Sequence, residues 1–548
     1  MHRYVIGFDF GTESVRALLV NVSDGTIARQ SAHSYAHGVI DTRLPVAGDV
    51  TLPPDYALQH PIDWMNAMAI ACRGAMRDAG ANPEHVLGIG VDFTSCTMLP
   101  SLRDGTPLCL LPQHENTPLA WPRLWKHHGA KAETDRINAV ARERNEKWLA
   151  RYGGVIGLEW FFPKVLETLN HAPEAYAAAK VWLEAGDWLV WQLIDGPFPN
   201  CAAQNLVRST CQAGYKAMWN ARTGYPDSDY FAAVHPAMKN VVIEKMPGTL
   251  LPPGRRAGGL NPEMAARLGL SAGTAVSAAI IDAHAGVCGA GVATPATLVM
   301  VMGTSSCHMM LSETEKFADG VAGVVADGIL PGYFGYETGQ ASVGDAFAWC
   351  AQTFKLSHSE LNEAAMRLPP GSGGVLALDW LNGCRTPLMD GRLSGAFVGV
   401  TLGTQPAQIY RAMMEATAFG VRWIVDTLQN AGVPVQAFVA SGGLPAKSSL
   451  LMQIYADVLG AEIRVAASDQ SVALGAAILG ALAAGPAATG HPGIEQAISA
   501  MAPQRDASVY RPQESAHRRY DALYSEYRTL AAPGSAILSV MRQLRGHV

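Results

Sequence analysis

The chain has 548 residues, of which 49% are hydrophobic and 16% are charged, so it can bury the cores of two large domains. Its 41 basic and 47 acidic residues give a formal net charge of −6, which argues against a general nucleic-acid or anionic-membrane surface. The nine cysteines form no C-x-x-C pair, so neither a zinc knuckle nor a disulfide framework is indicated. With no apolar signal core before Asp9, we expect a cytoplasmic protein with reduced thiols.

The first predicted element is a β-hairpin over residues 4–20, YVIGFDFGTESVRALLV. Two apolar runs flank a small polar turn at residues 11–14, which is typical of a tight hairpin. Asp9 lies inside the first run, where an unpaired carboxylate would be costly to bury. Two partners would satisfy it: a hydrated Mg²⁺ beside phosphate groups, or hydrogen bonds from the following turn.

The next segments mix helix and strand signals. Residues 61–80 begin at a proline, carry apolar residues at helical spacing and end at a glycine, so a helix is predicted. Residues 85–100, HVLGIGVDFTSCTMLP, read as a strand that enters a polar turn.

A second acidic segment is SAAIIDAHAGVCGAG, residues 277–291. Its apolar run ends at Asp282, and small residues that suit a helix start follow. A carboxylate at the end of a strand is well placed to act as a general base. His284 is a candidate base or ligand, with a structural role as the alternative.

Residues 298–311, LVMVMGTSSCHMML, repeat the pattern of the first hairpin, with a Gly-Thr-x-Ser turn at 303–306. The repeat indicates a duplicated architecture, with chance as the alternative for so short a match. The Ala-, Gly- and Pro-rich stretch at 286–297 is the expected boundary, which gives domains of residues 1–290 and 291–548.

Downstream, a strong helix is predicted over 406–432, followed by a strand, a glycine turn and a helix over 437–460, and a strand over 461–466. Residues 471–485, SVALGAAILGALAAG, are shorter than a membrane span and predict a buried helix that packs closely on a neighbour. The alternation of strands and helices predicts an α/β protein.

The two Gly-Thr turns are candidate phosphate sites, because the standard nucleotide-binding glycine motifs are absent. Backbone N–H groups and hydroxyls in such turns form a concave set of donors, and glycine allows close approach. Two facing turns would clamp a polyphosphate; ordinary hairpin turns are the alternative. The Gly-Gly turn at 442–443 would let a ring or ribose lie against the backbone, or it is a generic strand–helix turn.

Taken together, these segments resemble the FGGY carbohydrate kinases through nearly the whole chain. The resemblance rests on GFDFGTESVRALLV, IIDAHAG, MGTSSC, GAFVGVTLGTQPAQIYRAMMEATAFG and ASGGLPAKSSLLMQ. It implies two actin-like, ribonuclease H-like ATPase domains with a cleft between them. Further segments, among them GVDFTSCTMLP, LWKHHGA, AGYKAMW and YETGQASVGDAFAW, resemble the branch of the family that phosphorylates L-ribulose in arabinose breakdown.

The resemblance also implies roles for matching positions. Asp282 would be the catalytic base, and Asp9 with Asp282 would hold Mg²⁺ directly or through water. The ATP phosphates would lie at Gly11, Thr12, Glu13, Gly303, Thr304 and Ser305, and the adenosine at Gly442, Gly443 and Lys447. The sugar would be lined by Ser95, Trp125, Lys216, Asp282 and Glu337.

The expected ligands are ATP, Mg²⁺ and a small sugar, with no nucleic-acid or membrane partner and a homodimer as an open option. Three other hypotheses are kept. One is a kinase for another pentulose or pentitol, such as D-ribulose, xylulose or ribitol. The second is a non-kinase ATPase of the same fold. The third is a sugar sensor without catalysis, and the intact Asp9 and Asp282 disfavour this third hypothesis.

Overall fold

The hairpin predicted at the start of the chain is confirmed, and it lies at the centre of a mixed sheet. In the computed structural model, which describes residues 2–504 and 507–546, β1 pairs antiparallel with β2 and, on its other side, parallel with β4. The strand order is β3-β2-β1-β4-β10-β9, and β11 also pairs with β4. The strands of this first sheet are β1 (Tyr4–Phe10), β2 (Ser14–Asn21), β3 (Ile27–Ser34), β4 (Val86–Phe93), β9 (Arg256–Gly259), β10 (Ala275–Ser277) and β11 (Ile280–Ile281).

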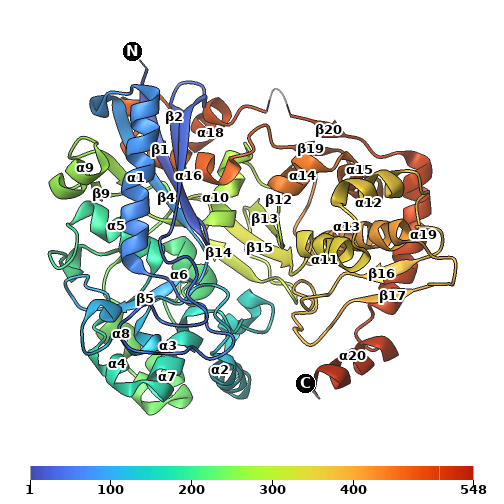
Figure 1. The fold of residues 1–548 in the computed structure, drawn as a ribbon, viewed down its shortest axis with the longest axis horizontal. Coiled ribbons are helices and arrows are strands. Elements are labelled where there is room, and N and C mark those ends of the chain that lie inside the picture. The colour runs from blue at the N-terminus through green and yellow to red at the C-terminus, as the bar shows by residue number, and fades with distance from the viewer. Residues whose placement is uncertain (1, 505–506, 547–548) are drawn as a thin grey trace.

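The second hairpin is the centre of an equivalent sheet, which supports the predicted duplication. Here β12 pairs antiparallel with β13 and parallel with β18, just as β1 pairs with β2 and β4. The order is β14-β15-β13-β12-β18-β19-β20. The strands are β12 (Thr297–Met302), β13 (Ser306–Ser312), β14 (Gly323–Ala326), β15 (Phe334–Gln340), β18 (Ala437–Ser441), β19 (Ile463–Val465) and β20 (Val509–Tyr510). The two sheets therefore form two lobes of the same plan (Figure 1).

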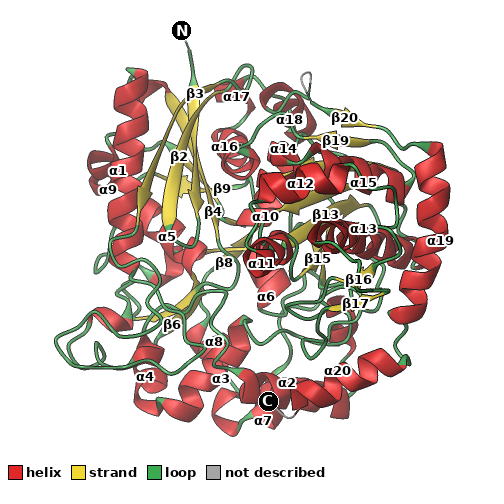
Figure 2. Ribbon diagram, turned by 45° about the vertical axis from the view of Figure 1, so that its right-hand side comes forward, coloured by secondary structure: helices red, strands yellow, loops and turns green. Residues whose placement is uncertain are grey.

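Helices cover both faces of each sheet, and two of them lie between the sheets. On the outer faces, α1 packs on the first sheet and α13 on the second. Between the sheets, α10 and α16 share one apolar core with residues of both sheets, such as Val5 and Val299. Figure 2 shows α1 and α16 on opposite faces of the first sheet. The α16 helix comes from the second half of the chain, yet it packs on the sheet formed by the first half.

The helices predicted from periodicity are confirmed, including the one that ends before Gly80 and the one that ends before Gly432. The helices of the first half are α1 (Pro61–Ala79), α2 (Lys131–Glu143), α3 (Phe161–His171), α4 (Pro173–Ala178), α5 (Ala185–Ile194), α6 (Thr210–Lys216), α7 (Ser228–Val234), α8 (Val241–Lys245), α9 (Pro262–Leu268) and α10 (Asp282–Gly289). Those of the second half are α11 (Gly344–Phe354), α12 (His358–Met366), α13 (Pro406–Asn430), α14 (Gly443–Lys447), α15 (Ser449–Leu459), α16 (Ser471–Ala484), α17 (Pro486–Thr489), α18 (Ile494–Met501), α19 (Glu514–Leu530) and α20 (Ala536–Gly546).

The first lobe carries a second layer of helices below its sheet. Helices α2, α3, α4 and α7 surround an apolar core of their own, and a two-stranded antiparallel sheet of β5 (Met98–Ser101) and β6 (Val181–Glu184) joins this region to the main sheet. In Figure 1 the region occupies the lower left of the molecule. Beside it, α6 ends at Lys216, which bonds to Glu337 of the second lobe.

The apolar segment 471–485 is the buried helix α16, as predicted, and its contacts are made by backbone. A Cβ atom on Gly7 or Gly90 would overlap a carbonyl oxygen of α16, that of Ala473 or Ala476 respectively. The same holds between the two central helices, where a Cβ on Gly289 would overlap the carbonyl oxygen of Ser471. Glycine at these positions lets the helix backbone rest directly on the sheet.

Two further expectations concern the thiols and the membrane. All nine cysteines are free in the structure. In the described part of the chain, no single helix is long and apolar enough to cross a membrane, and one pair, 471–484 with 486–501, passes that test only jointly and is bent by 108°.

We predict that Gly90→Ala destabilises the protein by about 3 kcal/mol, the upper range of overpacking costs, because the new methyl group would meet the backbone of Ala476. Urea unfolding monitored by circular dichroism measures this. Gly391→Ala is the matched control, since no heavy atom lies within 4 Å of a Cβ there, and it should change stability by less than ~0.5 kcal/mol. Equal effects of the two substitutions would contradict the backbone contact.

Candidate active site

Three carboxylates lie where neighbouring strands of the first sheet end. Asp9 on β1 is the register partner of Asp92 on β4, and Ile280 on β11 pairs with Asp92. Asp282 follows two residues after Ile280 and begins α10. Because side chains alternate along a strand, Asp9 and Asp92 point to the same face. Asp92 was not among the predicted site residues, although VDFTS ends an apolar run with a carboxylate just as IIDAH does.

Burial raises the pKa of all three carboxyl groups, and a side-chain hydrogen bond between Asp9 and Asp92 lowers the pKa of Asp9 and raises that of Asp92. Burial raises the pKa of Asp9, while Arg16, whose Nη1 donates to Asp9 Oδ2 over 2.8 Å, opposes that rise. Burial first, and then the charges of Asp9 and Asp282, raise the pKa of Asp92 well above its ordinary value. Burial also raises the pKa of Asp282 to about 7, against the N–H of Ala283, and Asp9 and Glu337 add to the rise.

This charge set fits a divalent cation. When ionised, the three carboxylates exceed the positive charge of the Arg16 guanidinium by two negative charges, and both oxygens of Asp92 are buried without a donor among the residues that the structure describes. Mg²⁺ prefers oxygen ligands and keeps several of its waters, so carboxylates that are not in mutual contact can hold it through water. The residues present are therefore suited to the metal that the sequence predicts.

A buried ion-pair cluster lies beside Asp282. Lys216, the last residue of α6, donates from Nζ to both oxygens of Glu337 on β15 at 2.9 Å. Arg385 also donates to Glu337, and His284 Nε2 lies 3.4 Å from Glu337 Oε2. Burial alone would raise the pKa of Glu337, but Lys216 and Arg385 hold it well below its usual value. The pair of Lys216 and Glu337 joins the first lobe to the second.

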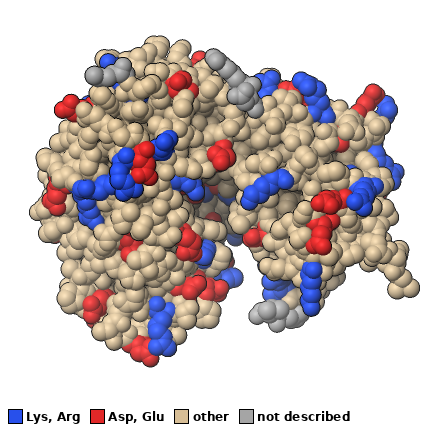
Figure 3. Space-filling view, turned by 45° about the horizontal axis from the view of Figure 1, so that its top comes forward, with Lys and Arg blue, Asp and Glu red and all other residues tan. Residues whose placement is uncertain are grey.

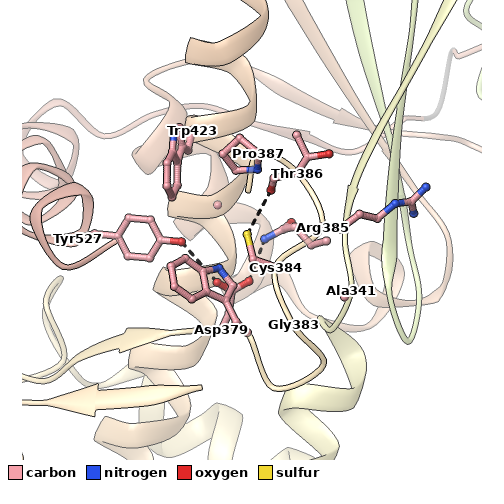
Figure 4. Close-up of a pocket in the computed structure, with 12 residues that line it drawn as sticks. Ala341, Asp379, Gly383, Cys384, Arg385, Thr386, Pro387, Trp423 and Tyr527 are labelled. Atoms are coloured by element: carbon pink, nitrogen blue, oxygen red, sulfur yellow. Dashed lines mark hydrogen bonds between the residues drawn. The ribbon is translucent and has the colours of Figure 1, made fainter. Parts of the chain in front are cut away.

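Arg385 is a residue that sequence reasoning missed, because it sits in an irregular loop, NGCRTP, with no periodic or motif signal. Only the fold brings it to Glu337. Figure 4 shows the Arg385 side chain extending away from a small pocket behind this loop, where Asp379 and Tyr527 face each other. That pocket contains none of the predicted site residues.

His284, a candidate base or ligand, is buried between aromatic and charged neighbours. Its ring lies 4.2 Å from that of Tyr215, and burial lowers its pKa despite the nearby Glu337. Burial therefore favours the neutral imidazole of His284, which packs beside the ion pairs of Glu337.

The first Gly-Thr turn is held by long-range hydrogen bonds. Gln59 donates from Nε2 to the carbonyl oxygen of Thr12 over 2.7 Å, and Trp125 donates from Nε1 to Thr12 Oγ1 over 3.1 Å. The backbone N–H of Tyr35 donates to the carbonyl oxygen of Glu13. These bonds bring the predicted sugar residue Trp125, which is 41% exposed, against the predicted phosphate turn.

The second Gly-Thr turn meets the predicted adenosine loop. A Cβ on Gly442 would lie 2.5 Å from the carbonyl oxygen of Met302, the residue before Gly303, and Gly442 has a φ of 98° that favours glycine. Gly303 and Thr304 are exposed, Ser305 is partly buried, and the N–H of Gly344 at the start of α11 donates to Gly303. Gly443 begins α14, and Lys447 ends it with an exposed side chain.

The segment that carries Ser95 is fixed by a buried ammonium. Lys164 donates from Nζ to the carbonyl oxygens of Cys96 at 2.7 Å and Leu124 at 2.8 Å. These carbonyls belong to the neighbours of Ser95 and Trp125, so one side chain sets the spacing of two predicted sugar residues. Ser95 itself is partly buried, and its hydroxyl lies 3.4 Å from Cys96 Sγ.

The structure thus brings Asp9, Asp282, Lys216 and Glu337 into one charged centre, because each of the other three shifts the pKa of Asp282. The space-filling view shows the surface hollowed between the two lobes (Figure 3). A site with a partly buried base, a cation–carboxylate pair and two turns rich in N–H donors is equipped to move a phosphoryl group onto a hydroxyl.

Comparison with known proteins gives family models along most of the chain. Residues 4–289 match the N-terminal domain, and 298–484 the C-terminal domain, of the FGGY family of carbohydrate kinases. A ribulokinase from Shouchella clausii is 46% identical over 562 aligned residues, covering all of this chain and 98% of the relative. A ribulokinase from Halalkalibacterium halodurans is 46% identical, covering 96% and 94%.

Among solved structures, a xylulose kinase from Brucella ovis superposes with a TM-score of 0.78 at 21% identity, covering 96% of this chain and 98% of that one. At that identity the likeness concerns the fold alone.

We predict that Glu337→Gln destabilises the protein by about 3–5 kcal/mol, because it leaves the cations of Lys216 and Arg385 buried without their carboxylate. Glu462→Gln is the control, since Glu462 pairs with Arg464 at the surface and should contribute less than ~1 kcal/mol. Denaturant unfolding of both variants at pH 7 measures the difference. A loss below ~1 kcal/mol for Glu337→Gln would mean that the cluster is solvated.

Proposed function

Since this chain belongs to the FGGY family of carbohydrate kinases, we propose that it transfers the γ-phosphoryl group of ATP to L-ribulose, giving L-ribulose 5-phosphate in the breakdown of L-arabinose. The two ribulokinases that match it across almost their whole length support this choice of sugar. The observation that carries the chemistry is Asp282: a partly buried carboxylate whose pKa is raised to about 7, next to the pair of Lys216 and Glu337.

The sugar would lie against the charged centre. We assign Lys216 to donate to the hydroxyl or carbonyl oxygens of the sugar. Glu337 would orient the Lys216 ammonium. Its carboxylate oxygens would also accept hydrogen bonds from sugar hydroxyls, through the lone pairs that Lys216 and Arg385 leave unused. Trp125 offers an aromatic wall for the carbon face, and Ser95 a hydroxyl at the neighbouring turn. This mixture of donors, acceptors and one aromatic ring suits a polyhydroxy ligand.

ATP would lie between the two Gly-Thr turns. We assign its phosphates to Gly11, Thr12, Glu13, Gly303, Thr304 and Ser305, and its adenosine to Gly442, Gly443 and Lys447. The packing of Gly442 against Met302 supports a continuous surface from the second turn to the adenosine side. Thr12 Oγ1, which accepts from Trp125, keeps its own proton free to donate to a phosphate oxygen.

In the reaction, Asp282 accepts the proton of the sugar hydroxyl as the hydroxyl oxygen attacks the γ-phosphorus, and the bond from that phosphorus to the bridging oxygen of ADP breaks, so that ADP leaves. The raised pKa of Asp282 makes it a stronger base than an exposed aspartate, while leaving it largely ionised above pH 7. We propose that Asp9 and Asp282 hold Mg²⁺, which when bound would neutralise phosphate charge. Closure of the lobes, fixed by Lys216 and Glu337, would keep water from the phosphoryl group.

We further propose domains of residues 1–290 and 291–548 and a cytoplasmic location, which nine unpaired cysteines suit. No nucleic acid or membrane enters the proposal.

We predict that Asp282→Asn lowers the rate of sugar-dependent ADP release by roughly 10²–10⁴-fold, the usual contribution of a general base, and leaves ATP binding largely intact. Coupled ADP detection with L-ribulose and calorimetry with ATP measure the two effects. Asp379→Asn, which alters a buried carboxylate away from the charged centre, is the control and should retain turnover. ADP release that does not depend on sugar would instead favour a non-kinase ATPase.

We predict that kcat/KM is highest for L-ribulose in a panel with D-ribulose, ribitol, L-arabitol, D-xylulose and glycerol. Each buried polar group that a sugar leaves unpaired costs about 1–3 kcal/mol, so glycerol, which is too short to reach them all, should be poor. If D-xylulose or glycerol clearly outperforms L-ribulose, the proposed sugar is wrong while the kinase assignment stands.

A further inference from the structure

One buried carboxylate has no role in the proposed mechanism. Asp92 is fully buried at the end of β4, and neither of its carboxyl oxygens accepts a hydrogen bond from a donor in the described part of the chain. Burying an unpaired carboxylate is costly, and buried polar groups in folded proteins nearly always have a partner. Two partners would offset this cost: a proton shared with the neighbouring Asp9 carboxyl, or a cation that binds from outside the polypeptide.

The strand register places Asp92 on the same face of the sheet as Asp9 and next to Asp282. Asp9 and Asp92 are directly paired on adjacent parallel strands, whose spacing is roughly 4.8 Å. Ile280 is level with Asp92 on the other side, so Asp282, two residues further, belongs to the same face just past the strand ends. The Asp92 carboxyl therefore lies between the two aspartates that we assign to the metal.

The helix that covers this face of the sheet is α16, and the three carboxylates lie near its N-terminal end. A Cβ on Gly88, Gly90 or Gly7 would overlap the backbone of α16, near Gly480, Ala476 and Ala473 respectively. Moving along β4 toward Asp92 thus moves along α16 toward its first residue, Ser471. Asp92 lies two residues beyond Gly90 along β4, toward the first turn of α16.

The charges around Asp92 are mostly negative. The ionisable groups nearest to it are the carboxylates of Asp9 and Asp282 and the guanidinium of Arg16. Arg16 is already bonded to Asp9 Oδ2. Tyr35 also lies within range, since its own pKa is raised by Asp9 and Asp92. No group in this set supplies a second positive charge, which a divalent cation would.

We propose that Asp92 is a third carboxylate of the divalent-cation site, holding the hydrated metal together with Asp9 and Asp282. This proposal rests on the metal site in the proposed function and extends it to a residue that neither the family motifs nor the sequence patterns singled out. The Asp92 carboxyl lies within hydrogen-bond reach of that of Asp9, and Asp282 begins the helix that follows the neighbouring strand, so all three can face water molecules of one hydrated Mg²⁺.

The test is metal binding by the full-length protein, without sugar and without turnover. Mn²⁺ replaces Mg²⁺, and the free ion is counted by electron paramagnetic resonance, with and without the non-hydrolysable analogue AMP-PNP. We expect Asp92→Asn to weaken Mn²⁺ binding by ~10-fold, as loss of a supporting carboxylate does at other metal sites. Asp379→Asn, which also removes one buried carboxylate, should leave Mn²⁺ binding unchanged.

Thermal unfolding separates this effect from misfolding. Without metal, Asp92→Asn should unfold at the same or a higher temperature than the natural chain, because it removes repulsion among buried carboxylates. With Mn²⁺, the rise in unfolding temperature should be smaller than in the natural chain, since less metal is bound. Asp92→Ser, which removes the charge with a smaller side chain, serves in the same way if the asparagine variant does not fold.

Asp9→Ala distinguishes the outcomes. If Asp9→Ala weakens Mn²⁺ binding and Asp92→Asn does not, Asp92 is a protonated neighbour of Asp9 and this inference is overturned. If neither changes binding, the metal site of the proposed function is wrong as well. Because the assay contains no sugar, an error in the choice of L-ribulose affects neither result.

Discussion

Direct contact between the backbone of α16 and the backbone of the first sheet sets the geometry of the molecule. Glycines at positions 7, 88 and 90 remove the side chains that would otherwise separate helix from sheet. The same close approach joins α16 to α10, whose first residue is Asp282. The position of the candidate base is therefore tied, through two helices that meet each other and the sheet at glycines, to the strands that carry Asp9 and Asp92. Few other packing modes would hold three carboxylates so near one another.

Electrostatic interactions also distinguish two parts of the candidate site. The carboxylates at the strand ends repel one another, whereas Glu337 is surrounded by cations. Opposite electrostatic environments thus lie side by side between the lobes: one suited to a metal and phosphate, the other to a neutral, hydroxyl-rich ligand. Because Lys216 and Glu337 come from different lobes, the second environment exists only while the lobes are together.

Local patterns in the sequence predicted most of the elements but not their partners. The spacing of apolar residues, together with glycine or proline at the ends of segments, predicted the two hairpins and the helices α1 and α13. These signals depend only on residues that are close in sequence. The apolar composition of α16 indicated burial, yet nothing local states that it lies on the sheet of the first half. Arg385 was beyond prediction for the same reason, since only tertiary folding brings its loop to Glu337. Asp92 carried the same local signal as Asp9 and Asp282, so it was within reach of the sequence.

The packing of α16 on the first sheet also has a consequence for how the protein is made. The sheet of the first lobe is complete once residue 281 has been synthesised, but the helix that covers its inner face begins at Ser471. During translation, the nascent first half would therefore expose the glycine-lined apolar face of that sheet while roughly 200 more residues are added, at about 5–20 residues per second. For tens of seconds this face is available to chaperones, or to another nascent chain, before its own helix emerges from the ribosome.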